Sequence, residues 1–177
     1  MELQDAINLI DFSDKMKFSK AMQWADLGCG SGLFTTALSY LLPVKSHVKG
    51  VDKELQRFFD EPRPGVSLDF LKADFQKDRL LLPPLDGLLM ANSLHYVKDK
   101  QVLLQKLRQH LKPQHHWLIV EYDTQVPNPW VPYPIQFNAL KELFLEMNYS
   151  EIHYLRHISS RYGHGNIYAC IISSSNL

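Results

Sequence analysis

Three alternating glycines follow an apolar segment near the start of the chain, in the sequence Ala-Asp-Leu-Gly-Cys-Gly-Ser-Gly at positions 25–32. Glycine has no Cβ and adopts positive φ readily, so a ligand can come close to the backbone of such a loop. The helix predicted next would direct its first N–H groups at that ligand. About twenty residues later Asp52 ends a second apolar segment, where a carboxylate can accept both hydroxyls of a ribose. Together these features predict a site for a nucleoside-bearing ligand.

The glycine spacing separates two classes of nucleotide site. A dinucleotide fingerprint reads Gly-x-Gly-x-x-Gly, which would require a glycine at Leu33. Here the glycines are Gly28, Gly30 and Gly32, and Asp26 precedes the first of them by two residues. This pattern resembles motif I of the class I S-adenosylmethionine-dependent methyltransferases. A nicotinamide-dependent oxidoreductase is the alternative, which Leu33 disfavours.

The resemblance to that family extends over nearly the whole chain. In its order of motifs Asp52 lies at the ribose, Asp74 and Phe75 lie at adenine, and residues 86–96 and 116–121 form the fourth and fifth strands with the loop after the fourth. One such match is weak, whereas several in the right order at strand-to-strand spacings are specific. The resemblance implies S-adenosyl-L-methionine as the cofactor and methyl transfer as the reaction.

Length and composition narrow the possible functions. The 177 residues suit a single domain spanning 1–177, and the 19 Lys and Arg balance the 19 Asp and Glu, which leaves no basic field for nucleic acid. No segment approaches the roughly eighteen apolar residues of a membrane span. Glu2 and Asp5 argue against a secretory signal, and two cysteines make no disulfide framework. We therefore expect a cytoplasmic protein with reduced Cys29 and Cys170 and no metal.

Hydrophobic periodicity predicts the elements that position these residues. Strands are expected at 22–27, 47–52, 68–72, 87–91, 116–121, 151–157 and 167–173, and helices at 3–10, 31–42, 53–60, 98–111 and around 140–147. Alternating strands and helices predict an α/β fold with a doubly wound, mostly parallel sheet. The last two strands lack a crossover helix, so they must pair as an antiparallel hairpin, with its turn at 161–165. The resemblance implies the seven-stranded, Rossmann-like sheet of the class I methyltransferases.

By the same resemblance, the glycine loop holds the methionine part of the cofactor, and Asp26 reaches its ammonium group directly or through water. Lys53 stands where family members often carry an apolar residue against adenine, and its stem can cover the ring while the amine reaches solvent. Asp74 can accept the adenine amine, helped by the Phe75 N–H or ring. Capping of a helix or loop is the alternative for Asp26, Asp52 and Asp74, and core packing is the alternative for Phe75.

Asn92 and Ser93 follow the fourth strand, at the carboxyl edge where open α/β sheets bind ligands, so we expect one of them to contact the cofactor. Enzymes that methylate the adenine amine carry Asn or Asp, two prolines and an aromatic residue at this position. This chain has Asn92-Ser-Leu-His instead, and its Asn128-Pro-Trp130 lies beyond the fifth strand. We therefore do not expect a nucleic-acid acceptor.

Five aromatic and imidazole side chains are candidates for contact with the acceptor: His95, Tyr96, Tyr122, Trp130 and Tyr133. Histidine is the natural proton carrier near neutral pH, although a His and a Tyr after a buried strand more often pack in the core. Residues 126–135 hold four prolines, so their rings can form an aromatic wall over the acceptor or simply tie the loop to the core. No catalytic residue is assigned.

The fold core takes up most of the chain, which leaves the N-terminal helix and residues 122–135 for acceptor recognition. We therefore expect a moderately apolar small-molecule acceptor beneath these two segments, methylated by in-line displacement. The short recognition segment also leaves open a cofactor-binding module without turnover, or one that needs a partner to complete the acceptor site. The methylated atom and the oligomeric state are left open.

Overall fold

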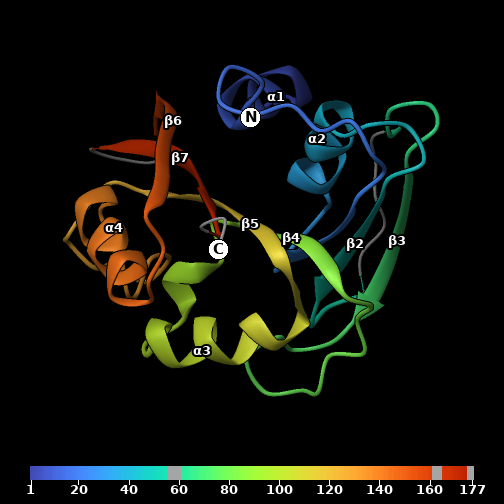
Figure 1. Ribbon diagram of the computed structural model, residues 1–177. Helices are drawn as coiled ribbons and strands as arrows, with labels where there is room; N and C mark the ends of the chain where they lie inside the picture. Colours follow the sequence, from blue (N-terminus) through green and yellow to red (C-terminus); the bar gives the residue numbers. More distant parts are fainter. Residues whose placement is uncertain (56–60, 161–164, 175–177) are drawn as a thin grey trace.

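The computed structural model describes residues 1–55, 61–160 and 165–174 (Figure 1). One sheet carries the strands in the order β3-β2-β1-β4-β5-β7-β6. Neighbours from β3 through β5 run parallel, and β7 runs antiparallel to both β5 and β6. The strand bounds are β1 Gln23–Leu27, β2 His47–Asp52, β3 Ser67–Lys72, β4 Leu85–Ala91, β5 Leu111–Tyr122, β6 Glu151–Ser159 and β7 Asn166–Ser173. The doubly wound sheet with a C-terminal antiparallel hairpin is confirmed.

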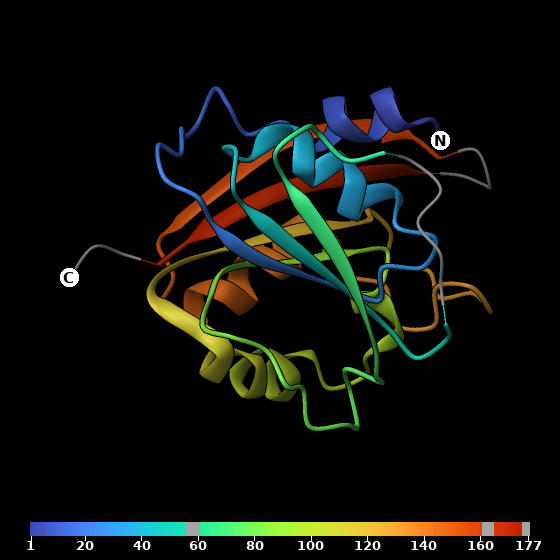
Figure 2. The ribbon, with the colours of Figure 1, turned by 90° about the vertical axis from the view of Figure 1, so that its right-hand side faces the viewer.

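Helices cover both faces of the sheet (Figures 1 and 2). On one face α1 (Leu3–Ile10) packs against α2 (Leu33–Leu41), and on the other lie α3 (Lys100–Leu107) and α4 (Phe137–Glu146). Each face has its own buried apolar cluster, with Trp24 in the first and Trp117 in the second. The sheet is therefore buried on both sides at its centre, as its continuous apolar strands require.

A close contact between β1 and β4 fixes the centre of the sheet. Trp24 pairs with Gly87, and a Cβ on Gly87 would lie 2.4 Å from the Trp24 ring. Only glycine leaves room for the indole there. The parallel pairing then brings the carboxyl ends of β1, β2, β4 and β5 to one edge of the sheet, where the predicted site residues lie.

Two expected elements differ from the structure. The helix expected at 98–111 ends at Leu107, a 3-10 turn follows at Arg108–His110, and β5 begins at Leu111 rather than at His116. Leu111 pairs with Leu85 across an irregularity in the β4–β5 ladder, and Lys112 forms an ion pair with Asp86 at 2.8 Å. The spacing of apolar residues predicted a helix at Leu111, because spacing along the chain carries no information about pairing with a distant strand.

The helix expected at 53–60 is not present in residues 53–55, and the remainder of it lies outside the described residues. Of the expected turn at 161–165, only Gly165 is described. Across the described ranges, no helix has the length and apolar character needed to cross a membrane. Nor does that part of the chain bring three or more His, Cys, Asp or Glu together in a metal-binding group.

Candidate functional site

The glycine loop joins β1 to α2 with a backbone that only glycine adopts easily. Gly28, Gly30 and Gly32 have φ values of +78°, +50° and +85°. A Cβ on Gly28 would lie 2.6 Å from the Ser93 Cβ, whereas a Cβ on Gly30 would meet nothing within 4 Å. Gly28 therefore allows the loop to pack on the end of β4, and Gly30 faces open space. Gly32 is the N-cap of α2, whose free N–H groups begin at this loop.

Asp26 lies in β1 beneath this loop and is almost fully buried. Its Oδ2 accepts a hydrogen bond from the Thr35 hydroxyl at 2.6 Å, while its Oδ1 is buried without a partner among the described residues. Burial raises the pKa of Asp26 to about 7; the Thr35 bond opposes this shift and the nearby Asp52 charge adds to it. An enclosed carboxylate oxygen without a partner fits the ammonium group of the cofactor's methionine part.

Asp52 ends β2 and already holds the glycine loop. Its Oδ2 accepts the Gly30 N–H and its Oδ1 accepts the Glu54 N–H, both at 3.0 Å. Each carboxylate oxygen can accept a second bond, so this arrangement still allows Asp52 to receive ribose hydroxyls. Lys53, next in the chain, is exposed beside it.

Asp74 and Phe75 follow β3. The Asp74 Oδ1 accepts the Gln76 N–H at 3.0 Å, so this side chain caps a turn, and its Oδ2 lies 3.7 Å from Lys77 Nζ. The Phe75 ring is buried, and its Cε1 would lie 3.2 Å from a Cβ on Gly28. Within the described residues the Phe75 N–H has no hydrogen-bond partner. The ring thus supports the glycine loop from the core, and the amide stays available for an adenine nitrogen.

Asn92 and Ser93 end β4 in different environments. Asn92 has a left-handed φ of +53°, and its side-chain Oδ1 is buried without a partner in the described chain. Ser93 is buried and donates its hydroxyl to the Leu27 carbonyl at 2.6 Å. Ser93 therefore ties the ends of β4 and β1 together, and Asn92 presents the unpaired oxygen.

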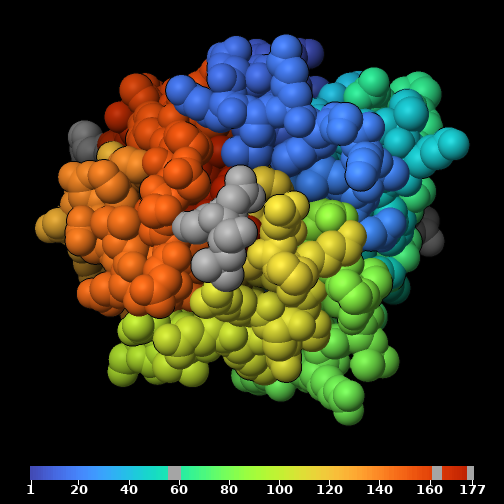
Figure 3. Space-filling view, in the orientation of Figure 1, coloured from blue at the N-terminus to red at the C-terminus, as the bar shows by residue number. Residues whose placement is uncertain are grey.

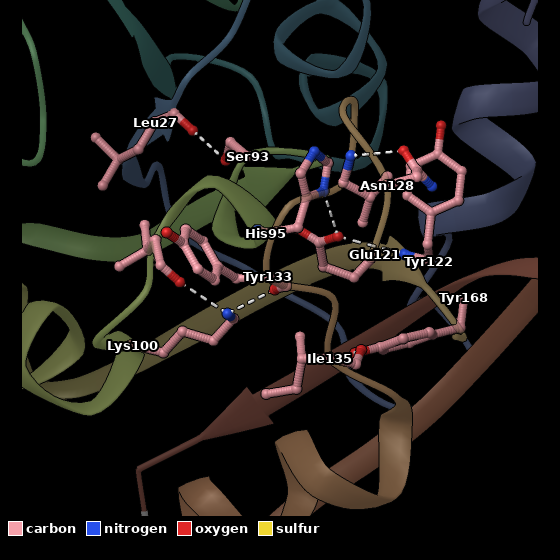
Figure 4. Close-up of polar contacts among 12 residues, drawn as sticks. Leu27, Ser93, His95, Lys100, Glu121, Tyr122, Asn128, Tyr133, Ile135 and Tyr168 are labelled. Carbon is pink, nitrogen blue, oxygen red and sulfur yellow. Dashed lines mark hydrogen bonds and ion pairs between the residues drawn. The ribbon is translucent and has the colours of Figure 1, made fainter. Parts of the chain in front are cut away.

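His95 forms a buried pair with Glu121, a residue that sequence reasoning recorded only as the end of a strand. The His95 Nδ1 lies 2.7 Å from Glu121 Oε2, and the His95 N–H donates to Oε1 at 3.0 Å (Figure 4). Their side chains are 2% and 0% exposed. An acidic residue at the end of a buried strand was the available signal, but only the pairing of β4 with β5 brings it to His95.

Three tyrosines contact His95, two through their rings and one through its backbone. The Tyr96 ring centroid lies 4.4 Å from that of His95, and the Tyr122 ring meets the imidazole edge-on at 5.8 Å. The Tyr133 N–H donates to the His95 carbonyl, and its own carbonyl accepts from Lys100 Nζ at 2.7 Å. The structure therefore brings the rings of Tyr96 and Tyr122 against His95, whereas Tyr133 meets His95 through its backbone and its ring lies 5.9 Å from Lys100 Nζ.

Trp130 lies differently from the other predicted acceptor residues. The residue is 79% exposed, and its backbone N–H donates to Asn128 Oδ1 at 2.9 Å. The adjacent Val131 is buried and forms an isolated bridge with Asn128. The proline-rich segment is thus anchored by Val131 and Tyr133 while the Trp130 ring points to solvent.

Two cavities lie away from this edge of the sheet. One of about 620 Å³ lies between residues 75–82 and α3, and another of about 580 Å³ lies near His115, His116 and Ser174. Of the predicted site residues, only Phe75 lines either of them. The glycine loop and the unpaired Asp26 and Asn92 oxygens point instead to the carboxyl edge, where parallel sheets bind ligands.

Comparison with known proteins agrees with this geometry. The family model of the methyltransferase domain matches residues 3–169. The plantazolicin methyltransferase BpumL with S-adenosylhomocysteine bound has a TM-score of 0.63 at 13% identity, over 98% of this chain and 84% of that one. A Burkholderia thailandensis 1,6-didemethyltoxoflavin-N1-methyltransferase, solved with 1,6-didemethyltoxoflavin and S-adenosylhomocysteine, has a TM-score of 0.67 at 14% identity, over 98% and 78%.

A third similar structure is that of a SAM-dependent methyltransferase from Aquifex aeolicus, with a TM-score of 0.59 at 16% identity, over 99% of this chain and 100% of that one. A search of curated proteins by sequence returned no relative. The family match spans nearly the whole chain and includes the glycine loop. The chain belongs to the methyltransferase-domain family and is a class I, S-adenosylmethionine-dependent methyltransferase.

Proposed function

We propose that this enzyme methylates a small-molecule acceptor by in-line displacement at the carboxyl edge of its sheet. One observation carries the choice of acceptor: the rings of Tyr96, after β4, and Tyr122, at the end of β5, lie against His95, and Tyr133 bonds the His95 carbonyl through its backbone N–H. The strand β4 lies between β5 and β1, which leads into the glycine loop. Such a cluster suits a moderately apolar molecule. The chain's zero net charge offers no field for a nucleic acid, so we propose none as partner.

Different residues at this edge of the sheet are proposed to bind different parts of S-adenosylmethionine. We assign the methionine part to Gly28, Gly30, Gly32 and Asp26, with Asn92 Oδ1 as a further acceptor for its ammonium group. Asp52 receives the ribose; Lys53, Asp74 and Phe75 surround adenine; and Ser93 supports the loop from behind. The bound cofactor supplies a methyl group on a sulfonium, which is already activated, so the protein's task is to orient the acceptor's nucleophile and exclude water.

The acceptor site lies between the proline-rich segment 122–135 and the N-terminal helix. The similar Burkholderia enzyme is solved with a small heterocycle, which supports a small molecule as the acceptor here. We further propose that the enzyme acts in the cytoplasm as one domain over residues 1–177. The free thiols of Cys29 and Cys170 are consistent with a reducing compartment.

Binding and turnover test the proposal separately. Calorimetry is expected to show binding of S-adenosylmethionine and S-adenosylhomocysteine and none of NAD. Mass spectrometry across a panel of aromatic hydroxyl and N–H acceptors is expected to find methylated product from the isolated chain. A chain that binds the cofactor but transfers methyl only after a partner protein is added would contradict the proposal.

A matched pair of tyrosine variants locates the acceptor. Tyr96→Ala is expected to raise the acceptor KM by about tenfold, because its exposed ring borders His95, with the S-adenosylhomocysteine affinity unchanged. Tyr40→Ala removes a similarly exposed ring on α2 and is expected to leave both constants unchanged. Equal effects of the two variants on the acceptor KM would show that the acceptor does not bind beside Tyr96.

A further inference from the structure

The Glu121 carboxylate holds His95 through two hydrogen bonds, one to its backbone and one to its ring. Glu121 uses one oxygen for the His95 backbone N–H and the other for its ring Nδ1, and Oε2 also receives the Tyr122 N–H at 3.3 Å. Both side chains are buried, and the two residues are 26 positions apart in sequence. One carboxylate therefore fixes the orientation of the imidazole from both its backbone and its ring.

The contact between His95 Nδ1 and Glu121 selects one tautomer of the neutral imidazole. A carboxylate only accepts hydrogen bonds, so Nδ1 carries the hydrogen and Nε2 carries a lone pair. The Nε2 atom has no hydrogen-bond partner among the described residues, and Figure 4 shows it on the side of the ring away from Glu121. The His95 side chain as a whole is 2% exposed, so a ligand has to come close to this face of the ring to reach Nε2.

The groups around the pair favour the charge that forms when Nε2 takes a proton. Glu121 faces the imidazole directly, and its charge also acts on Lys100, whose Nζ is held by the carbonyls of Val97 and Tyr133. Burial lowers the pKa of Lys100, and the Glu121 charge opposes that shift. Among the described residues, the rings of Tyr96 and Tyr122 also lie beside the imidazole, and the Glu121 charge acts on Tyr168, whose hydroxyl donates to the Ile135 carbonyl.

We propose that His95 is the general base of the methyl transfer and Glu121 its positioning residue, which makes the acceptor a neutral group that loses a proton on methylation, such as a hydroxyl or N–H. This inference rests on the proposed function. The acceptor's O–H or N–H bond breaks as its proton passes to Nε2, and the electron pair left on oxygen or nitrogen forms the bond to the methyl carbon. The methyl–sulfur bond breaks with its electron pair staying on sulfur. The imidazolium then releases the proton to solvent.

The key variant is His95→Asn, because its amide can still donate to Glu121 from the position of Nδ1 but has no atom at Nε2. It is expected to lower kcat about 100-fold or more, with the acceptor KM and the S-adenosylhomocysteine affinity within about threefold. The acid limb of the pH–kcat profile is expected to disappear. Glu121→Gln is expected to lower kcat about tenfold and to shift the acid limb of the pH–kcat profile, since the imidazolium loses its counter-charge.

A matched histidine serves as control. His116 is largely buried at the opposite edge of the sheet, where its Nδ1 lies 2.8 Å from Ser173 Oγ, and burial lowers its pKa to about 4. His116→Asn is expected to keep the parental kcat and pH profile. An acceptor that is already ionised at the assay pH is expected to be methylated by His95→Asn at nearly the parental rate, because it needs no base.

Nitrogen-15 NMR of the histidine rings in the ligand-free protein gives a readout that needs no acceptor. A hydrogen on Nδ1 and none on Nε2 of neutral His95 is expected, with loss of that preference in Glu121→Gln. A hydrogen on Nε2, or parental kcat and pH profile in His95→Asn, overturns the proposal. If the parent transfers methyl to no acceptor, the proposed function fails, while the NMR result still decides the state of the ring.

Discussion

At the scale of single residues, the carboxyl edge of the sheet combines polar atoms that the protein leaves unpaired with others that it pairs completely. Asp26 and Asn92 each keep a buried oxygen without a partner among the described residues, whereas both oxygens of Glu121 are used by His95. An enclosed unpaired oxygen is costly unless a ligand satisfies it. The unpaired oxygens of Asp26 and Asn92 therefore fit the cofactor site that we propose, and the paired oxygens of Glu121 hold His95 in one orientation.

The first prediction concerns Asp26. Because burial raises its pKa from 3.8 to about 7, between those values the folded protein holds a proton that the unfolded chain has lost. The free energy of unfolding therefore falls as pH rises through this window. The cofactor's ammonium favours the carboxylate, so S-adenosylhomocysteine is expected to bind more tightly as pH rises towards 7. At pH 6 its binding is expected to release most of a proton, measurable by calorimetry in buffers of different ionisation enthalpy.

Variants of the same contact serve as controls. Asp26→Asn is expected to abolish the proton release and to weaken binding about tenfold or more at pH 7, since a charged hydrogen bond contributes about 1.5–3 kcal/mol. Thr35→Val removes the hydroxyl that favours the carboxylate and is expected to move the pH window upward. Affinity that stays constant between pH 5.5 and 7 would rule out Asp26 as the ammonium partner.

The second prediction concerns Asp52. Asp52→Ala is expected to weaken S-adenosylhomocysteine binding by about 1–3 kcal/mol, because the ribose hydroxyls lose their acceptor and the Gly30 N–H loses its anchor. Asp52→Asn retains one acceptor oxygen, so a smaller loss is expected. Asp69→Ala is the control: this carboxylate bonds Lys49 in the middle of β2 and is expected to have no effect. An Asp52→Ala affinity within twofold of the parent would contradict the assignment.

At the scale of elements, the glycine loop has two kinds of constraint that a matched pair of variants separates. Gly28→Ala and Gly30→Ala share the cost of positive φ, about 1–2 kcal/mol, but only the first places a Cβ against Ser93. Gly28→Ala is therefore expected to lower the free energy of unfolding by about 1–3 kcal/mol more than Gly30→Ala, measured by urea denaturation.

Cofactor binding should respond in the opposite order. The methyl group of Gly30→Ala would enter the open space to which we assign the methionine part of the cofactor. This variant is therefore expected to fold but to bind S-adenosylhomocysteine at least tenfold more weakly. If Gly30→Ala binds as the parent does, the open space at this position is not the cofactor's. If the two variants have equal free energies of unfolding, a Cβ at position 28 does not clash with Ser93 at a measurable cost.

At the scale of the whole molecule, two apolar clusters on opposite faces of one sheet predict a single cooperative unit. Far-UV CD and near-UV CD, to which the buried Trp24 and Trp117 contribute, are expected to show one coincident thermal transition. At a hundred times its Kd, S-adenosylhomocysteine stabilises the folded state by about 2.7 kcal/mol, which for a chain of this size raises Tm by about 5–11 °C. Two separate transitions would contradict a single domain.

The space-filling view shows how closely the C-terminal strands and the N-terminal segment meet on one face of the molecule (Figure 3). Arg156 of β6 donates to the Asp11 carbonyl just after α1 and forms an ion pair with Asp14 at 3.3 Å. Together with the packing of α1 on α2 and β6, this contact holds the N-terminal helix to the sheet. The helix is therefore positioned before any acceptor arrives.

The sequence by itself predicted the class of fold, the glycine loop and the position of Asp52, because these depend on local requirements. Positive φ demands glycine at particular positions, and apolar periodicity identifies strands and helices. The order of motifs then indicated the family. Where periodicity was ambiguous, as at Leu111, the sequence assigned a helix and the structure has the start of β5.

Only the tertiary structure decided which distant side chains meet. The contact of His95 with Glu121, the bond of Ser93 to Leu27 and the close approach of Gly28 to Ser93 all follow from the register of the parallel strands. Register is set by the packing of the whole sheet and is not encoded within any short segment. For that reason the sequence indicated the proposed cofactor site through the spacing of its glycines, whereas the contact of the proposed base with Glu121 depends on the pairing of β4 with β5.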